Sequence, residues 1–125
     1  MRYMMFIKHP EDFDRSQVPQ SLFAAMDEFV GEYAGKGMFI DGAGLQPLAK
    51  GTRVRLSGGK ITVTDGPFSE AKEVVGGYSV IEAPTHADAV ELATRFMELH
   101  RAHWPEFEGE CEVRPFEEMD GPPQA

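Results

Sequence analysis

Apolar side chains in the first strand-like segment fall on both faces of the chain. A strand is predicted over residues 2–8, with apolar residues on alternate faces: Tyr3, Met5 and Ile7 on one, Met4 and Phe6 on the other. Apolar residues on both faces are typical of a sheet that is covered on both sides. A chain of this size has too few helices to supply both covers, so this pattern is a first indication of a dimer.

Apolar residues at three- and four-residue spacing predict two amphipathic helices. The first occupies about residues 19–34, with Pro19 in its first turn. The second occupies about residues 86–102, where Thr85 is the expected N-cap and Asp88 completes a pattern similar to a capping box.

The remaining segments predict strands, two of which form a hairpin. Residues 53–56 and 60–63 alternate around Gly58-Gly59, a pair that allows the positive φ angles of a tight turn. Further strands are predicted in three places: from residue 38, over 78–83 and over 110–116. The resulting order predicts an α+β fold, a ferredoxin-like sandwich with both helices on one face of an antiparallel sheet.

Composition narrows the range of partners. The chain has 125 residues, with 12 Lys and Arg against 21 Asp and Glu, a formal charge of −9. Nucleic acid and anionic membranes need a basic footprint, so neither is expected as a partner. No segment approaches the roughly 20 apolar residues of a membrane span. The single cysteine, Cys111, excludes a disulfide within the chain, and a cytoplasmic location is the simplest interpretation.

Residues 64–73, which contain Asp65-Gly66-Pro67-Phe68 and are followed by Gly76-Gly77-Tyr78, resemble the signature of the DGPF-motif proteins of the YCII-related family. Other segments are similar to the family in the same order: Arg2-Tyr3-Met4, Gly42-Ala43-Gly44-Leu45-Gln46-Pro47, Gly51-Thr52-Arg53-Val54-Arg55 and Glu112-Val113-Arg114-Pro115. The resemblance covers residues 1–117, which we expect to form one domain. The acidic tail, residues 118–125, is expected to be disordered.

The resemblance implies a dimeric α+β barrel, in which two ferredoxin-like subunits face each other with their sheets. Some YCII-related members are similar to small hydrolytic or dehalogenating enzymes that use a histidine on the first helix with a nearby aspartate. Residues 19–34 contain no histidine, so that pair cannot be carried over to this chain. Members with the DGPF motif often look like companions of extracytoplasmic-function sigma factors, which implies a regulatory role.

Asp65 has two interpretations. In the favoured one, its carboxylate accepts hydrogen bonds from the following backbone, Gly66 and Pro67 set the loop, and Phe68 anchors the loop in the core. This structural interpretation explains all four residues without a ligand. In the alternative, a rigid loop presents Asp65 at a pocket, with Lys72 nearby, as a general base or as a partner for a cationic group.

Lys8 leads to a second group of candidate residues. If its face of the first strand is buried in a dimer, Lys8 needs an acidic partner such as Asp41 or Asp65. We therefore predict a Lys/Asp cluster at the rim of the cavity between the sheets, with Phe68 and Tyr78 as further ligand-binding residues. Asp65 and Asp41 are also the candidate catalytic residues. The glycines after Asp41 indicate either a bulge, which is favoured, or the close approach of a ligand.

His100 and His103 are three residues apart on the second helix and could face the same way. With Cys111 or Glu106 they could form a metal site, but polar histidines near a helix C-terminus are a common stabilising feature. We predict no metal site and no cofactor. Cys111 is interpreted as a small core residue, because no histidine or asparagine is placed to activate its thiol.

Two hypotheses about function follow. The favoured one is a homodimeric small-molecule-binding or regulatory module that uses the cavity between the sheets, because no catalytic constellation is complete. The alternative is a small cofactor-free enzyme with hydrolase-like acid–base chemistry, carried by Asp65, Asp41 and Lys8.

Overall fold

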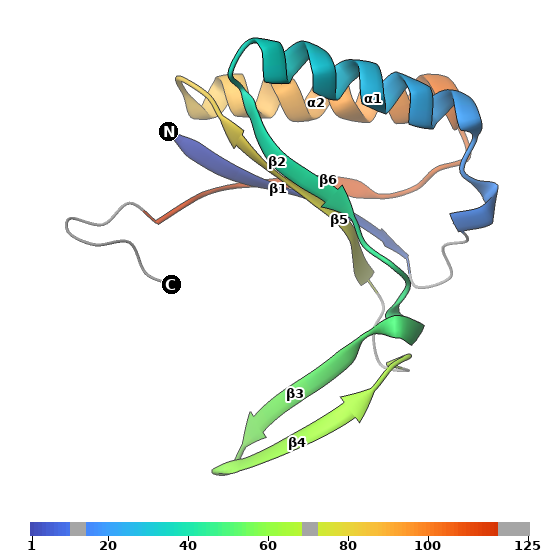
Figure 1. Cartoon of the computed structure of the whole chain (residues 1–125), viewed down its shortest axis with the longest axis vertical. Helices are drawn as coiled ribbons and strands as arrows, with labels where there is room; N and C mark the ends of the chain where they lie inside the picture. The colour runs from blue at the N-terminus through green and yellow to red at the C-terminus, as the bar shows by residue number, and fades with distance from the viewer. Residues whose placement is uncertain (11–14, 69–72, 118–125) are drawn as a thin grey trace.

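The computed structural model describes residues 1–10, 15–68 and 73–117. The tail predicted to be disordered and Lys72 lie outside these residues. Two helices lie side by side over one face of a four-stranded antiparallel sheet (Figure 1), which confirms the predicted α+β fold and is consistent with a ferredoxin-like arrangement. The elements in chain order are β1 (Arg2–Pro10), η1 (Arg15–Gln17), α1 (Gln20–Gly35), β2 (Phe39–Gly44), η2 (Leu48–Lys50), β3 (Thr52–Ser57), β4 (Lys60–Asp65), β5 (Glu73–Glu82), α2 (His86–His103) and β6 (Glu110–Pro115).

The main sheet has the strand order β2-β5-β1-β6, and each neighbouring pair is antiparallel. The register shifts between Ile7 and Lys8 on β1 and between Phe39 and Asp41 on β2. The second shift lies just before Asp41, whereas the glycines after it pair in regular register, so they do not mark the bulge that the sequence favoured there.

The helices begin close to their predicted starts, at Gln20 and His86. Thr85 is the N-cap of α2, because the Asp88 backbone N–H donates to its hydroxyl oxygen at 3.1 Å. Most strands are longer than the sequence pattern predicts, whereas β6 ends one residue earlier, at Pro115. β5 begins at Glu73 rather than at residue 78. Gly76, which looks like a break in the sequence, lies inside the sheet, where a Cβ would approach the His9 ring to 2.5 Å.

The core lies between the helices and the sheet. Tyr3 and Ile81 pair across β1 and β5, and both are 0% exposed. Their partners in the core come from β1, from both helices and from the residue after β5: Met5, Phe29, Tyr33, Ala83, Ala89, Leu92 and Ala93. Cys111 packs against this core, and burial raises the pKa of its thiol to about 11, so its predicted role as a core residue is confirmed.

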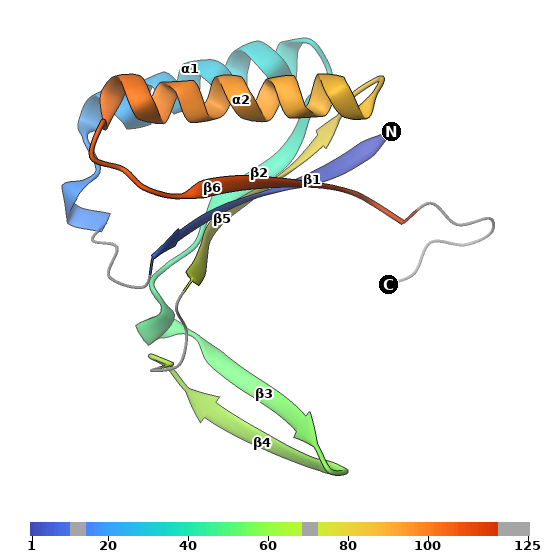
Figure 2. The same ribbon diagram turned by 180° about the vertical axis from the view of Figure 1, so that it is seen from behind.

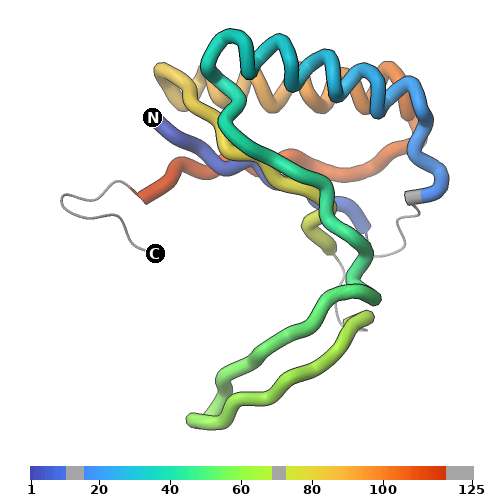
Figure 3. Tube along the Cα trace, viewed as in Figure 1, coloured from blue at the N-terminus to red at the C-terminus, as the bar shows by residue number. Residues whose placement is uncertain are grey.

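The β3–β4 hairpin forms a second sheet and stands apart from the main body (Figure 3). Gly58 and Gly59 have φ angles of 58° and 75°, as predicted for its turn. Seen from either side, the hairpin lies beyond the face of the main sheet that the helices leave uncovered (Figure 2). We call that uncovered face, which carries Met4, Phe6 and Val80, the open sheet face.

Candidate functional site

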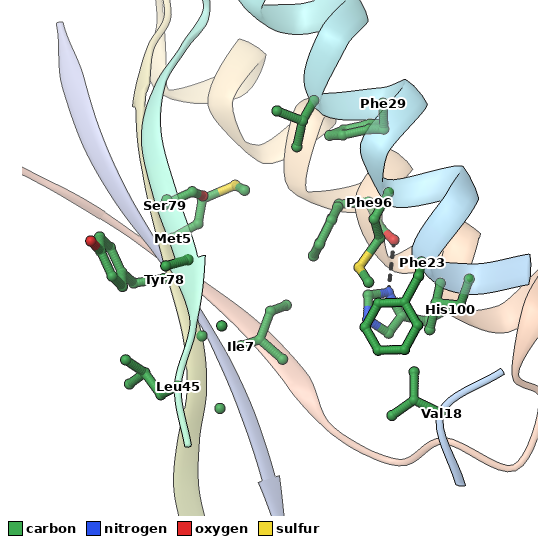
Figure 4. Close-up of a pocket in the computed structure, with 18 of the residues that line it drawn as sticks. Met5, Ile7, Val18, Phe23, Phe29, Leu45, Tyr78, Ser79, Phe96 and His100 are labelled. Carbon is green, nitrogen blue, oxygen red and sulfur yellow. Dashed lines mark hydrogen bonds between the residues drawn. The ribbon is translucent and has the colours of Figure 1, made fainter. Parts of the chain in front are cut away.

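A cavity of about 460 Å³ lies between the helices and the main sheet (Figure 4). Its volume falls within the range of roughly 300–1,000 Å³ that is usual for small-molecule sites. Met5 and Ile7 on β1 face Phe23, Phe96 and the rest of the helical wall across it. The cavity therefore lies on the helix side of the main sheet. The cavity that the sequence predicted lies on the other side, between the sheets of a dimer.

The cavity has a closed inner wall and an accessible rim. Met5, Leu22 and Phe29 form part of the inner wall and are buried. Phe23 and Leu45 also line the cavity but are 41% and 42% exposed, so they lie at its opening to solvent. Large apolar side chains at an opening are typical of a site that admits a ligand with an apolar body.

Two polar side chains of the described residues are buried, Ser79 at 8% exposure and His100 at 6%, and both line the cavity. Ser79 lies on β5, on the face turned toward the helices, and His100 lies in the last turns of α2. A few polar groups converging on an apolar space are the usual composition of a binding pocket.

His100 is held in one orientation. Its ring packs between those of Phe96 and Phe107, with centroids 5.0 Å from each. Its Nδ1 lies 3.0 Å from the Phe96 carbonyl oxygen. Because a carbonyl can only accept, Nδ1 carries the proton and Nε2 is left as an acceptor. This second ring nitrogen faces the strands across the cavity (Figure 4).

Burial lowers the pKa of His100, with a smaller opposing effect from the Phe96 carbonyl, so the ring is neutral near pH 7. His100 is thus a polar residue near the end of α2, as the sequence suggested, but it is buried and faces the cavity rather than solvent. One signal could have indicated its place: His100 follows Phe96 by four residues, on the apolar face of α2. Among the described residues, no group of three His, Cys, Asp or Glu side chains is arranged to hold a metal ion.

Lys8 has acidic partners, as predicted, but they differ from the predicted ones. Its Nζ lies 2.5 Å from Glu112, 3.8 Å from Glu73 and 3.9 Å from Glu110. The hydrogen bond with Glu112 is the main cause that raises the pKa of Lys8, and the same bond lowers the pKa of Glu112. These glutamates lie on the two strands beside β1, so Lys8 is paired within its own sheet.

Asp65 lies at the base of the hairpin. Its carboxylate accepts a hydrogen bond from the Thr52 hydroxyl at 3.0 Å, across the β3–β4 pair. Phe68 is half-buried and stacks against the Arg53 guanidinium at 4.0 Å from the ring centroid. It is not a member of the buried core cluster, so the prediction that Phe68 anchors the loop in the core is wrong.

Asp41 is exposed on β2, the edge strand, and lies opposite Val80. Tyr78 is among the cavity-lining residues, but its ring points away from the helices (Figure 4). Lys8, Asp41 and Asp65 thus occupy three separate places in one chain, and the predicted Lys/Asp cluster is not assembled within it.

The fold and cavity define a small α+β protein with a ligand-sized space between its two layers. The model of the YCII-related domain matches residues 1–106, and the chain belongs to this family. No curated protein matches the chain. No helix in the described part of the chain is both long and apolar enough to cross a membrane.

Proposed function

We propose that the protein binds a small, largely apolar molecule in the cavity between its helices and its sheet, as a binding or regulatory module. The observation that carries this proposal is that the two buried polar side chains of the described residues, Ser79 and His100, both line an otherwise mostly apolar cavity. Neutral His100 offers Nε2 as an acceptor, so the ligand class is an apolar body with one hydroxyl or N–H donor.

We also propose that the chain is a member of the DGPF-motif group and forms a dimeric α+β barrel. Residues 65–68 and the segments around them support the group. Met4, Phe6 and Val80 on the open sheet face support a homodimer with facing sheets, since pairing would remove this apolar strip from water. In such a cytoplasmic dimer, Lys8 and Asp41 would line the space between the sheets.

The alternative of an acid–base enzyme has less support. Its three candidate residues are far apart in the fold, and Asp65 already has a structural partner in Thr52. General acid–base catalysis needs groups within hydrogen-bond reach of one reacting atom. We therefore favour binding over catalysis.

The substitution Gly44→Leu tests the cavity. Gly44 pairs with Gly77 on the face turned toward the helices, it lines the cavity, and the nearest heavy atom to an added Cβ is 4.0 Å away. A leucine here should fill the space without distorting the strand. With 4-tert-butylcyclohexanol as probe, followed by the fluorescence of the single tryptophan, Trp104, we expect affinity to fall about tenfold or more.

The matched control is Gly31→Leu, which adds the same side chain at an exposed helical position with no heavy atom within 4 Å. Its affinity should equal that of the unmodified protein. The methyl ether of the probe, which lacks the donor, should bind more weakly if His100 accepts the hydroxyl proton. Equal affinity of the Gly44→Leu and Gly31→Leu variants would reject the cavity as the binding site.

Lowering the pH is expected to destabilise the protein through His100. Folding lowers the pKa of this residue below the value of about 6.5 of an unfolded chain, so the unfolded state binds more protons in that window. The stability that comes from the neutral ring is complete above about pH 6.5 and is lost as the pH falls below it. Urea unfolding at a series of pH values should show this loss, and the His100→Phe variant should show a smaller slope. An unchanged slope in that variant would contradict the assignment.

A further inference from the structure

We propose that the β3–β4 hairpin is an arm that packs on the open sheet face of a second copy of this chain. This inference rests on the homodimer of the proposed function and adds the part of each copy that holds the other. It is independent of the ligand cavity, which lies on the other side of the main sheet.

The hairpin exposes an unusual amount of apolar surface on one side. Val54 pairs with Val63, and Leu56 pairs with Ile61, so these four side chains share one face of the hairpin. We call this the apolar arm face. Its residues are 70%, 67%, 71% and 65% exposed in that order, whereas scattered single apolar residues are the norm on a protein surface. Four adjacent ones indicate an interaction surface.

The contacts at the base of the arm orient it away from its own body. The Gly66 backbone N–H donates to the Gly51 carbonyl oxygen at 2.8 Å, and the Thr52 hydroxyl donates to Asp65. Phe68 packs on Arg53 beside these bonds. From this base the arm runs outward on the side of the open sheet face and stays apart from it (Figures 1 and 2). A body docked on the open sheet face would come to lie beside the arm.

Charge identifies a second copy as the occupant. The arm, residues 52–65, contains three basic residues, Arg53, Arg55 and Lys60, and one acidic residue, Asp65, at its base. The rest of the chain has nine basic and 20 acidic residues, a formal charge of −11. When two copies exchange arms, the basic arm of each copy lies against the acidic body of the other, and the opposite charges attract each other across the interface.

The open sheet face has the complementary chemistry. Met4, Phe6 and Val80 form its apolar centre. Exposed carboxylates stand at its margins, Asp41 on β2 and Glu110 on β6, and Arg114 on β6 lies over Phe6 on the same face. In the dimer with facing sheets, the two arms lie between the sheets. There the apolar arm face of each copy covers the centre of the other copy's open sheet face, and the basic side chains of the arm reach the margins. A two-fold axis lets both arms do so at once.

The substitution Leu56→Glu tests the arm in the full-length protein. It places a charge in the apolar arm face. Sedimentation equilibrium should then show a dimer dissociation constant raised by about tenfold or more. Thr62→Glu adds the same charge on the other face of the same hairpin and is the matched control, with a much smaller expected effect. Circular dichroism of both variants should match that of the unmodified protein, because the hairpin stands outside the core.

Cross-linking tests where the arm lies. A photoreactive p-benzoylphenylalanine in place of Val63, in a mixture of isotopically light and heavy copies, should link β4 of one copy to β1 or β5 of another. Links only between two arms, or only within one chain, would overturn the proposal. An unmodified protein that stays monomeric would reject both the dimer and the arm. A dimer that Leu56→Glu leaves intact would reject the arm alone, and neither result bears on the ligand titration.

Discussion

Replacing Tyr3 with alanine is expected to lower the free energy of unfolding by about 3–5 kcal/mol. Tyr3 is 0% exposed and lies on β1, between β5 and β6, where it pairs with Ile81 and Pro115. Its ring also meets the His86 ring edge-on at a centroid distance of 5.5 Å. Truncation would leave a cavity at the centre of the core. Urea denaturation should show a lower midpoint with an unchanged m value.

Tyr3→Phe is the control for this prediction. It keeps the ring and removes only the hydroxyl, whose described hydrogen bond is a weak one to the Met1 sulfur at 3.6 Å. We expect its loss to stay within about 1 kcal/mol. Because whole domains are stable by only about 5–15 kcal/mol, the alanine variant should be close to its unfolding limit at moderate temperature. Similar losses in both variants would mean that the ring is not central to the core.

Replacing Gly66 with alanine is expected to cost about 1–3 kcal/mol or more. An added Cβ would lie 1.9 Å from the Leu48 carbonyl oxygen and 3.2 Å from the Gly51 carbonyl oxygen. Both are backbone atoms, so the chain has to move, and the Gly66–Gly51 hydrogen bond at 2.8 Å would be disturbed. Urea unfolding and amide hydrogen exchange at the base of the arm would measure the two effects.

Gly51→Ala is the neighbouring control. A Cβ at that position would be 3.4 Å from the Leu48 carbonyl oxygen, and the backbone there is extended, with φ −94°. Alanine is therefore expected to fit with little change in stability. If Gly66→Ala behaved in the same way, close packing would not explain the glycine of the Asp65–Phe68 tetrapeptide.

Local signals in the sequence predicted most of the fold. The helices follow from apolar spacing and from the Thr85 cap, which depends on residues within one turn. The hairpin follows from two adjacent glycines with positive φ. Each of these signals acts over a few residues, so it can be interpreted without knowing what packs around it. The extent of β5 was underestimated because Gly76 and Gly77 look like a break until β1 is placed beside them.

The candidate site depends on contacts between distant segments, which explains why the sequence did not predict it. Lys8 meets Glu112 because of the register between β1 and β6, and alternation gives the faces of a strand but not its register. His100 becomes a neutral cavity residue only when Phe107 folds back over it from beyond the end of α2. Its position near a helix terminus gave no indication that it faces a cavity.

The main sheet is formed without any strand of the hairpin. Residues that decide whether the chain folds and residues on the apolar arm face are therefore largely separate sets. Substitutions on the arm can accumulate with little penalty to folding, whereas substitutions at Tyr3 or Ile81 cannot. Divergence between related chains made in the same cell can then be concentrated on the arm. Two gene duplicates that diverge on the arm would then stop forming mixed dimers with each other, while each keeps the same fold.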